Sequence, residues 1–180
     1  MKLFARGDFR GSRWNMRKIG LDEKIIDAIL RSTDAGFQIA GIAPEPVGAS
    51  RLASRSLEIS AVIGMVGRRT GTLTLNISSR AAIYLSNAFA GTNKNELNDE
   101  VLDAVAEITN IIAGRMKAEL SDTNYGITQI SCPSIIIGGD YRVYHFQGFE
   151  SASVEFLIPD MPAMVMFDRF FSISLALSKK

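Results

Sequence analysis

The sequence is poor in the residues that most enzymes use for covalent or metal chemistry. It has one cysteine, Cys132, and one histidine, His145, among 180 residues. A single cysteine excludes an internal disulfide and a cysteine-based zinc site, and we expect Cys132 to be a small core residue. His145 lies in a segment with a strand pattern, and no G-x-S-x-G nucleophile motif accompanies it. The composition therefore argues against a serine or cysteine hydrolase and against a cysteine-based zinc site.

Long apolar runs are also missing. None reaches the roughly 18 residues that a membrane-spanning helix needs, and the richest stretch, residues 152–171, is broken by acidic residues and prolines. The first residues are basic and interrupted by glycine, unlike a secretory signal. These absences predict a cytoplasmic protein that does not contact a membrane.

Charge is nearly balanced over the whole chain, at +1, but it is unevenly distributed. Residues 1–20 carry six basic side chains against one aspartate, so the remainder is acidic overall. We expect a flexible basic arm over residues 1–19 and a single folded domain over residues 20–180. A basic arm of this kind is compatible with nucleic acid or a membrane surface. Because the other basic residues are not interleaved with aromatics on one face, we expect no nucleic-acid partner.

Hydrophobic periodicity predicts an α+β fold. Two long helices are expected over residues 22–40 and 98–120, and a short one over residues 79–90. A linker with Pro44, Pro46 and Gly48 should follow the first helix. Strand patterns cover residues 57–66, 70–77, 127–137, 142–150, 153–159 and 164–177. We expect the helices to cover one face of a largely antiparallel sheet.

The second long helix has two opposed faces, because helical positions advance by about 100° per residue. One stripe is apolar and should be buried: Val101, Val105, Ile108 and Ile112. The opposite stripe carries two carboxylates, a carboxamide and a glycine: Asp103, Glu107, Asn110 and Gly114. A glycine inside a helix costs about 1 kcal/mol relative to alanine. Glycine also leaves a patch of helix without a side chain, which another protein can approach closely, and such an approach would offset the cost.

Polar residues on a solvent face are ordinary one by one, but here they share a spacing with a later proline. Asp103, Glu107, Asn110 and Pro133 resemble the D/S-x3-E-x2-N-x22-P signature of the CheC/CheX/FliY chemotaxis phosphatases. Residues 99–104, 107–114 and 133–138 are similar to CheX sequences in particular. The first long helix has the same spacing without the glutamate and asparagine, which resembles CheX, with one active site per subunit, more than CheC with two.

The resemblance implies a phosphatase that hydrolyses the aspartyl phosphate of a CheY-like response regulator without a covalent intermediate. It implies that Asn110 orients the attacking water and that Glu107 pairs with a lysine in the partner's phosphorylation pocket. Asp103 is a weaker candidate for the same interface, and Pro133 shapes the backbone near the helix. Mg²⁺ would be supplied by the partner, so the resemblance implies that the chain needs no metal ligands and no cofactor of its own. The family also implies a homodimer.

The sequence leaves two other functions open. The first is a non-catalytic binding or assembly module, since flagellar switch proteins such as FliM resemble this fold without being phosphatases. The presence of both Glu107 and Asn110 favours catalysis, because a purely structural module needs neither. The second is a small-molecule hydrolase with a pocket, which no motif supports.

Overall fold

The computed structural model describes residues 21–51, 57–139 and 148–179. The predicted arm over residues 1–19, His145 and most of the strand predicted over residues 142–150 lie outside these ranges. The described elements are α2 (Glu23–Gln38), β1 (Glu45–Ser50), β2 (Ile59–Gly67), β3 (Gly71–Ile77), α3 (Ser79–Ala90), α4 (Asp99–Ser121), β4 (Ile127–Ile130), β5 (Ser134–Ile137), β6 (Phe149–Leu157), the 3₁₀ turn η1 (Met166–Arg169) and β7 (Phe170–Ser178).

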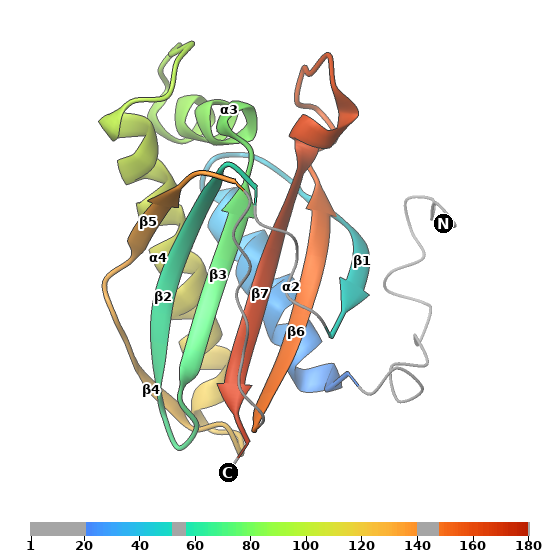
Figure 1. The fold of residues 1–180 in the computed structure, drawn as a ribbon, viewed down its shortest axis with the longest axis vertical. Coiled ribbons are helices and arrows are strands. Elements are labelled where there is room, and N and C mark those ends of the chain that lie inside the picture. Colours follow the sequence, from blue (N-terminus) through green and yellow to red (C-terminus); the bar gives the residue numbers. More distant parts are fainter. Residues whose placement is uncertain (1–20, 52–56, 140–147, 180) are drawn as a thin grey trace.

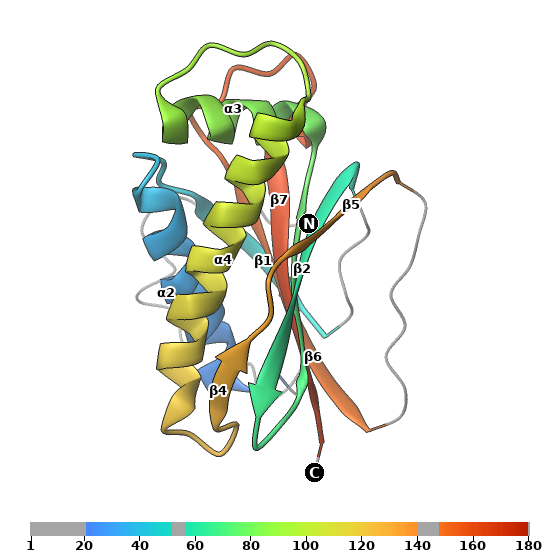
Figure 2. The same ribbon diagram turned by 90° about the vertical axis from the view of Figure 1, so that its left-hand side faces the viewer.

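The strands form one sheet in the order β1-β6-β7-β3-β2-β4, and β5 also pairs with β2. Every pairing among the described strands is antiparallel. Helices α2 and α4 run side by side on one face of the sheet, and α3 lies across one end on the same side (Figures 1 and 2). The predicted α+β fold, with two long helices and a short one on a largely antiparallel sheet, is confirmed.

The core lies between these helices and the sheet. Strand β3 turns every second residue toward the core, and Leu73, Leu75 and Ile77 are fully buried. Phe37 of α2 stacks on Phe171 of β7 with ring centroids 4.4 Å apart, so aromatic packing ties the helix layer to the sheet. A short hairpin connection joins β2 to β3, and the two strands pair in continuous register. This packing fixes the layer on which α4 rests.

The linker predicted around Pro44, Pro46 and Gly48 is wrong, because residues 45–50 form strand β1. Proline and glycine weaken a strand prediction, since proline lacks a backbone N–H. Strand β1 is the edge of the sheet beside β6, where a missing donor can face away from the ladder. The register also shifts between Pro46 and Gly48, so a bulge absorbs the irregular residues.

Two strand predictions in the C-terminal third are corrected. Residues 127–137 form two strands, β4 and β5, rather than one, because the chain is interrupted just before Pro133. The strand predicted over residues 164–177 begins at Phe170, after the turn η1. Cys132 is exposed rather than a core residue, because it lies in the same interruption.

Candidate functional site

The start of α4 is fixed by two asparagines. The side chain of Asn98 accepts a hydrogen bond from the backbone N–H of Val101 at 3.0 Å, which caps the helix. The connection from α3 is held by Asn87, whose amide oxygen accepts from the Lys94 backbone N–H at 2.7 Å and from the Thr92 hydroxyl at 2.9 Å. The first turn of α4 is therefore held in a defined place relative to α3.

The inner face of α4 packs against the core. Val101, Val105, Ile108 and Ile112 have no exposed surface, as predicted. Helix α2 approaches closely at Gly36, where an added Cβ would lie 2.4 Å from Cγ1 of Ile112. This contact sets the rotation of α4 about its axis, because Ile112 has no room to turn toward α2.

The opposite face of α4 is turned to solvent and carries the residues singled out in the sequence. Asp103 and Glu107 are exposed, and Asn110 and Gly114 are half-buried. Glu107 and Asn110 are three residues apart, so their Cα atoms are separated by about one turn of the helix and their side chains project from one face. A Cβ built on Gly114 would meet no atom within 4 Å. The structure thus places these four residues in one line on an open surface.

Pro133 lies between β4 and β5, and these two strands run beside α4 (Figure 2). Ser131 lies two residues before Pro133, and its backbone N–H donates to the Gly64 carbonyl at 2.9 Å. The Ser131 hydroxyl oxygen accepts from the Gly64 N–H at 2.8 Å. The Ser131 side chain thus accepts the Gly64 N–H where the chain leaves the regular strand ladder. Two residues later, Pro133 has no backbone N–H to donate. Pro133 thus lies where the chain passes from β4 to β5, and its side chain carries no polar group.

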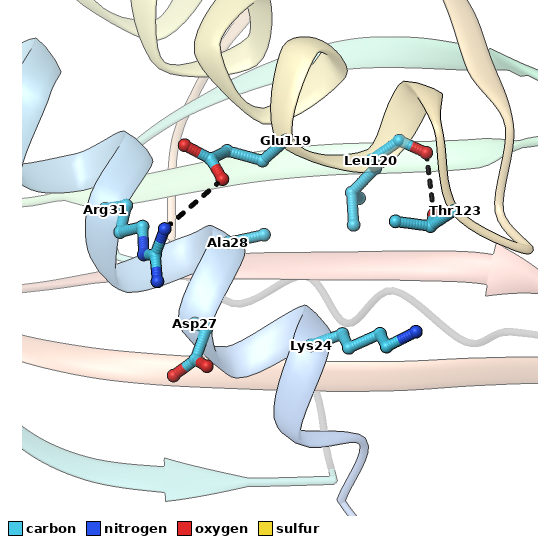
Figure 3. Close-up of a pocket in the computed structure, with 7 residues that line it drawn as sticks. All are labelled: Lys24, Asp27, Ala28, Arg31, Glu119, Leu120 and Thr123. Carbon is cyan, nitrogen blue, oxygen red and sulfur yellow. Dashed lines mark hydrogen bonds and ion pairs between the residues drawn. The ribbon is translucent and has the colours of Figure 1, made fainter.

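A small hollow of about 140 Å³ lies between α2 and the end of α4 (Figure 3). Arg31 faces Glu119 across it at 3.8 Å, and the Thr123 hydroxyl donates to the Leu120 carbonyl at 2.7 Å. Glu119 follows Asn110 by nine residues, which is half a turn around the helix. The hollow is therefore on the side of α4 away from the Asp103–Gly114 line, and its hydroxyl is already engaged. It gives no support to a small-molecule hydrolase.

Two described groups with shifted pKa values fasten the ends of elements. Burial raises the pKa of Tyr125, whose hydroxyl donates to the Asp22 carboxylate at the start of α2, 2.5 Å away. The pKa of Glu58 is lowered chiefly because its carboxylate accepts the Ser79 backbone N–H at 2.7 Å, at the first turn of α3. These two hydrogen bonds fix the starts of α2 and α3, and neither group lies on the open face of α4.

Sequence reasoning missed Asn87 and Gly36, which position α4 without belonging to its open face. Asn87 gives no signal in the sequence, because its bonds reach a loop of irregular structure. Gly36 is a glycine within a predicted helix, which is a signal of close packing. Within the described ranges, no group of three or more His, Cys, Asp or Glu side chains is arranged to hold a metal ion, and no helix has the length and apolarity to cross a membrane.

Comparison with known proteins gives a consistent family. The family model described as chemotaxis phosphatase CheX matches residues 59–157, more than half of the chain, including all of α4. The CheY-P phosphatase CheX of Thermotoga maritima is 26% identical over 130 residues, which cover 70% of this chain and 83% of that protein.

Solved structures share the fold. A putative chemotaxis protein from Desulfovibrio vulgaris Hildenborough matches with a TM-score of 0.73 and 23% identity, covering 89% of this chain and 99% of that one. The CheX–CheY–BeF₃–Mg²⁺ complex of Borrelia burgdorferi matches with a TM-score of 0.68 and 19% identity, covering 86% of this chain and 98% of that one.

Proposed function

The chain belongs to the chemotaxis phosphatase CheX family, and on this basis we propose that it hydrolyses the aspartyl phosphate of a CheY-like response regulator. The Thermotoga maritima relative is a CheY-P phosphatase, which supports the reaction. The Borrelia burgdorferi neighbour is a complex of CheX with CheY, which supports the partner. The setting would be chemotaxis or a related two-component pathway.

The observation that carries the proposal is the open face of α4. Glu107 and Asn110 project together from neighbouring turns, beside the bare helix surface at Gly114. None of these residues is needed to fill the core. A site of this kind is incomplete in the free chain, and it would be completed by the phosphorylated surface of the partner.

Asn110 is suited to orient the attacking water. Phosphoryl transfer from an acyl phosphate passes through a loose transition state with the entering and leaving oxygens in line, so the catalyst chiefly positions the water. A carboxamide can accept from water through its oxygen and donate through its NH₂ group while staying neutral. A carboxylate in its place would repel the phosphoryl oxygens. No covalent bond to the chain forms in this scheme.

Glu107 and Asp103 would serve docking. We expect Glu107 to pair with the lysine of the regulator's phosphorylation pocket, and Asp103 to add negative charge one turn earlier. Mg²⁺ would be held by the regulator's own carboxylates, where it neutralises the phosphoryl oxygens. The chain then contributes two side chains of α4 to the reaction and no cofactor.

We also propose that the protein is a homodimer, as the family resemblance implies. Strand β5 pairs with β2 alone among the described strands, and it carries the exposed Ile136 and Ile137. An apolar, open sheet edge is a surface on which a second copy can pair. Sedimentation analysis of the free chain tests this assignment separately from catalysis.

The phosphatase proposal is tested by charging the organism's CheY-like regulators with acetyl phosphate and Mg²⁺ and following phosphate release. A substoichiometric amount of this chain should accelerate the decay of one regulator over many turnovers. The alternative, a non-catalytic binding or assembly module, predicts binding with no change in the decay rate. Decay at the intrinsic rate for every regulator would reject the phosphatase.

A further inference from the structure

Lys117 is a cation without a described partner on the same side of α4 as Asn110. It follows Asn110 by seven residues, which returns it to within about 20° of the same direction around the helix. The neighbouring Arg115 is paired with Glu119 at 3.3 Å, and Arg31 lies 3.8 Å from the same carboxylate. Within the ranges that the structure describes, Lys117 makes no ion pair or side-chain hydrogen bond, and it is half-buried. Its charge is therefore available to a partner.

The surface between Lys117 and Asn110 is open. Gly114 lies between them on α4, and a Cβ built there would meet no atom within 4 Å. The two residues are separated by about 10 Å along the helix axis. Helical side chains lean toward the N-terminus, so the Lys117 side chain leans toward Gly114 and Asn110. A group seated over Gly114 is thus flanked by a carboxamide on one side and an ammonium on the other.

The face is also polarised in charge. Asp103 and Glu107 occupy its N-terminal half and Lys117 its C-terminal half. Two carboxylates alone would repel a phosphorylated aspartate, which is dianionic near neutral pH, and a lysine ammonium opposes that repulsion. The arrangement fits a partner whose basic group meets the acidic half while its phosphoryl group meets the gap at Gly114.

We propose that Lys117 recognises the phosphoryl group of the docked regulator, so that it selects the phosphorylated form and fixes the direction in which the regulator binds. This inference rests on the proposed phosphatase function and adds a cationic contact to the Glu107–Asn110 pair. Lys117 contributes to binding and orientation, and the water is oriented by Asn110.

The experiment measures the affinity of one CheY-like regulator in two states, with Mg²⁺ alone and with Mg²⁺ plus beryllofluoride as the phosphoryl mimic. Lys117→Met, which keeps the length of the apolar stem, is compared with Lys117→Arg and with the matched control Lys24→Met on exposed α2. We expect Lys117→Met to raise the Kd of the regulator with beryllofluoride about 3- to 10-fold. The Kd of the regulator with Mg²⁺ alone should rise by less than twofold. Lys117→Arg should stay within about twofold of the wild type in both states.

The outcomes separate this inference from the phosphatase proposal. If the wild type is an active phosphatase and Lys117→Met weakens both regulator states equally, or no more than Lys24→Met does, the role of Lys117 is rejected and the phosphatase stands. If the wild type neither binds the beryllofluoride form more tightly nor releases phosphate, both are rejected. A selective loss in Lys117→Met, restored in Lys117→Arg, supports phosphoryl recognition, because lost packing alone would not distinguish the two states.

Discussion

Gly36 of α2 faces Ile112 of α4 so closely that an added Cβ would lie 2.4 Å from Cγ1 of the isoleucine. Gly36→Ala should therefore destabilise the protein even though alanine favours a helix, because Cγ1 cannot move away without shifting the side chain or α4 itself. We expect the free energy of unfolding to fall by about 1–3 kcal/mol, measured by urea denaturation.

The matched control is the glycine on the outer face of α4. A methyl group on Gly114 meets nothing within 4 Å, so Gly114→Ala should raise the free energy of unfolding by about 0.5–1 kcal/mol. If the bare patch serves docking, the same variant should bind the regulator more weakly. Equal stability changes at Gly36 and Gly114 would contradict the packing argument, and unaltered regulator binding would contradict the docking role of Gly114.

Asn110→Ala should reduce phosphate release from the charged regulator by about 100-fold or more, because the water would lose its positioning group. The side chain is half-buried on the outer face, so the fold and regulator binding should change little. Asn110→Asp is the isosteric comparison, and it should also fail because its carboxylate repels the phosphoryl oxygens. Normal turnover by either variant would exclude the role given to Asn110.

Glu107→Gln should weaken regulator binding about tenfold while keeping the shape of the side chain, because the ion pair with the partner's lysine is lost. Calorimetric titration of the beryllofluoride-charged regulator measures the effect. Glu23→Gln on exposed α2 removes the same charge elsewhere and should have no effect. The docking role is wrong if Asn110→Ala weakens binding as much as Glu107→Gln.

Tyr125→Phe should lower the free energy of unfolding by about 2 kcal/mol below pH 9, since the Asp22 carboxylate loses its hydroxyl donor. The pKa of Tyr125 is raised in the folded protein by burial and by this bond. As the pH rises above about 10, tyrosine ionises in the unfolded chain first and favours unfolding. The difference between the wild type and the phenylalanine variant should therefore shrink above pH 10, and denaturant titrations at pH 8 and pH 11 measure it. A constant difference would mean that the folded pKa is unshifted.

The parts of the molecule with one dominant physical signal could be predicted from the sequence. Both faces of α4 follow from a 3.6-residue period over 23 helical residues, and the hairpin of β2 and β3 follows from a short connection between alternating strands. Strand β1 could not be predicted, because Pro46 is compatible with a strand only at an edge, and the edge is a property of the whole sheet. The exposure of Cys132 depends on how Ser131 and Gly64 bond across the interruption before Pro133. Long-range pairings of this kind leave no local pattern.

The residues around the site differ in how far the sequence could predict their positions. Asp103, Glu107, Asn110 and Gly114 lie together because one helix carries them all. The supporting contact at Asn87 has no periodic signature, since it joins a helix end to an irregular loop. Among the methionines and phenylalanines of residues 156–171, Phe156, Met161 and Phe171 are buried, whereas Met164, Met166 and Phe167 are exposed.

The continuity of α4 has one further consequence. Every residue of its open face belongs to a single stretch of backbone, so their mutual spacing is set by the helical repeat and not by how loops and strands are assembled. Substitutions elsewhere can tilt or shift this helix as a unit, but they leave the internal geometry of the face unchanged. The arrangement of Asp103, Glu107, Asn110 and Gly114 therefore depends on the helix alone and not on the order of the strands beneath it.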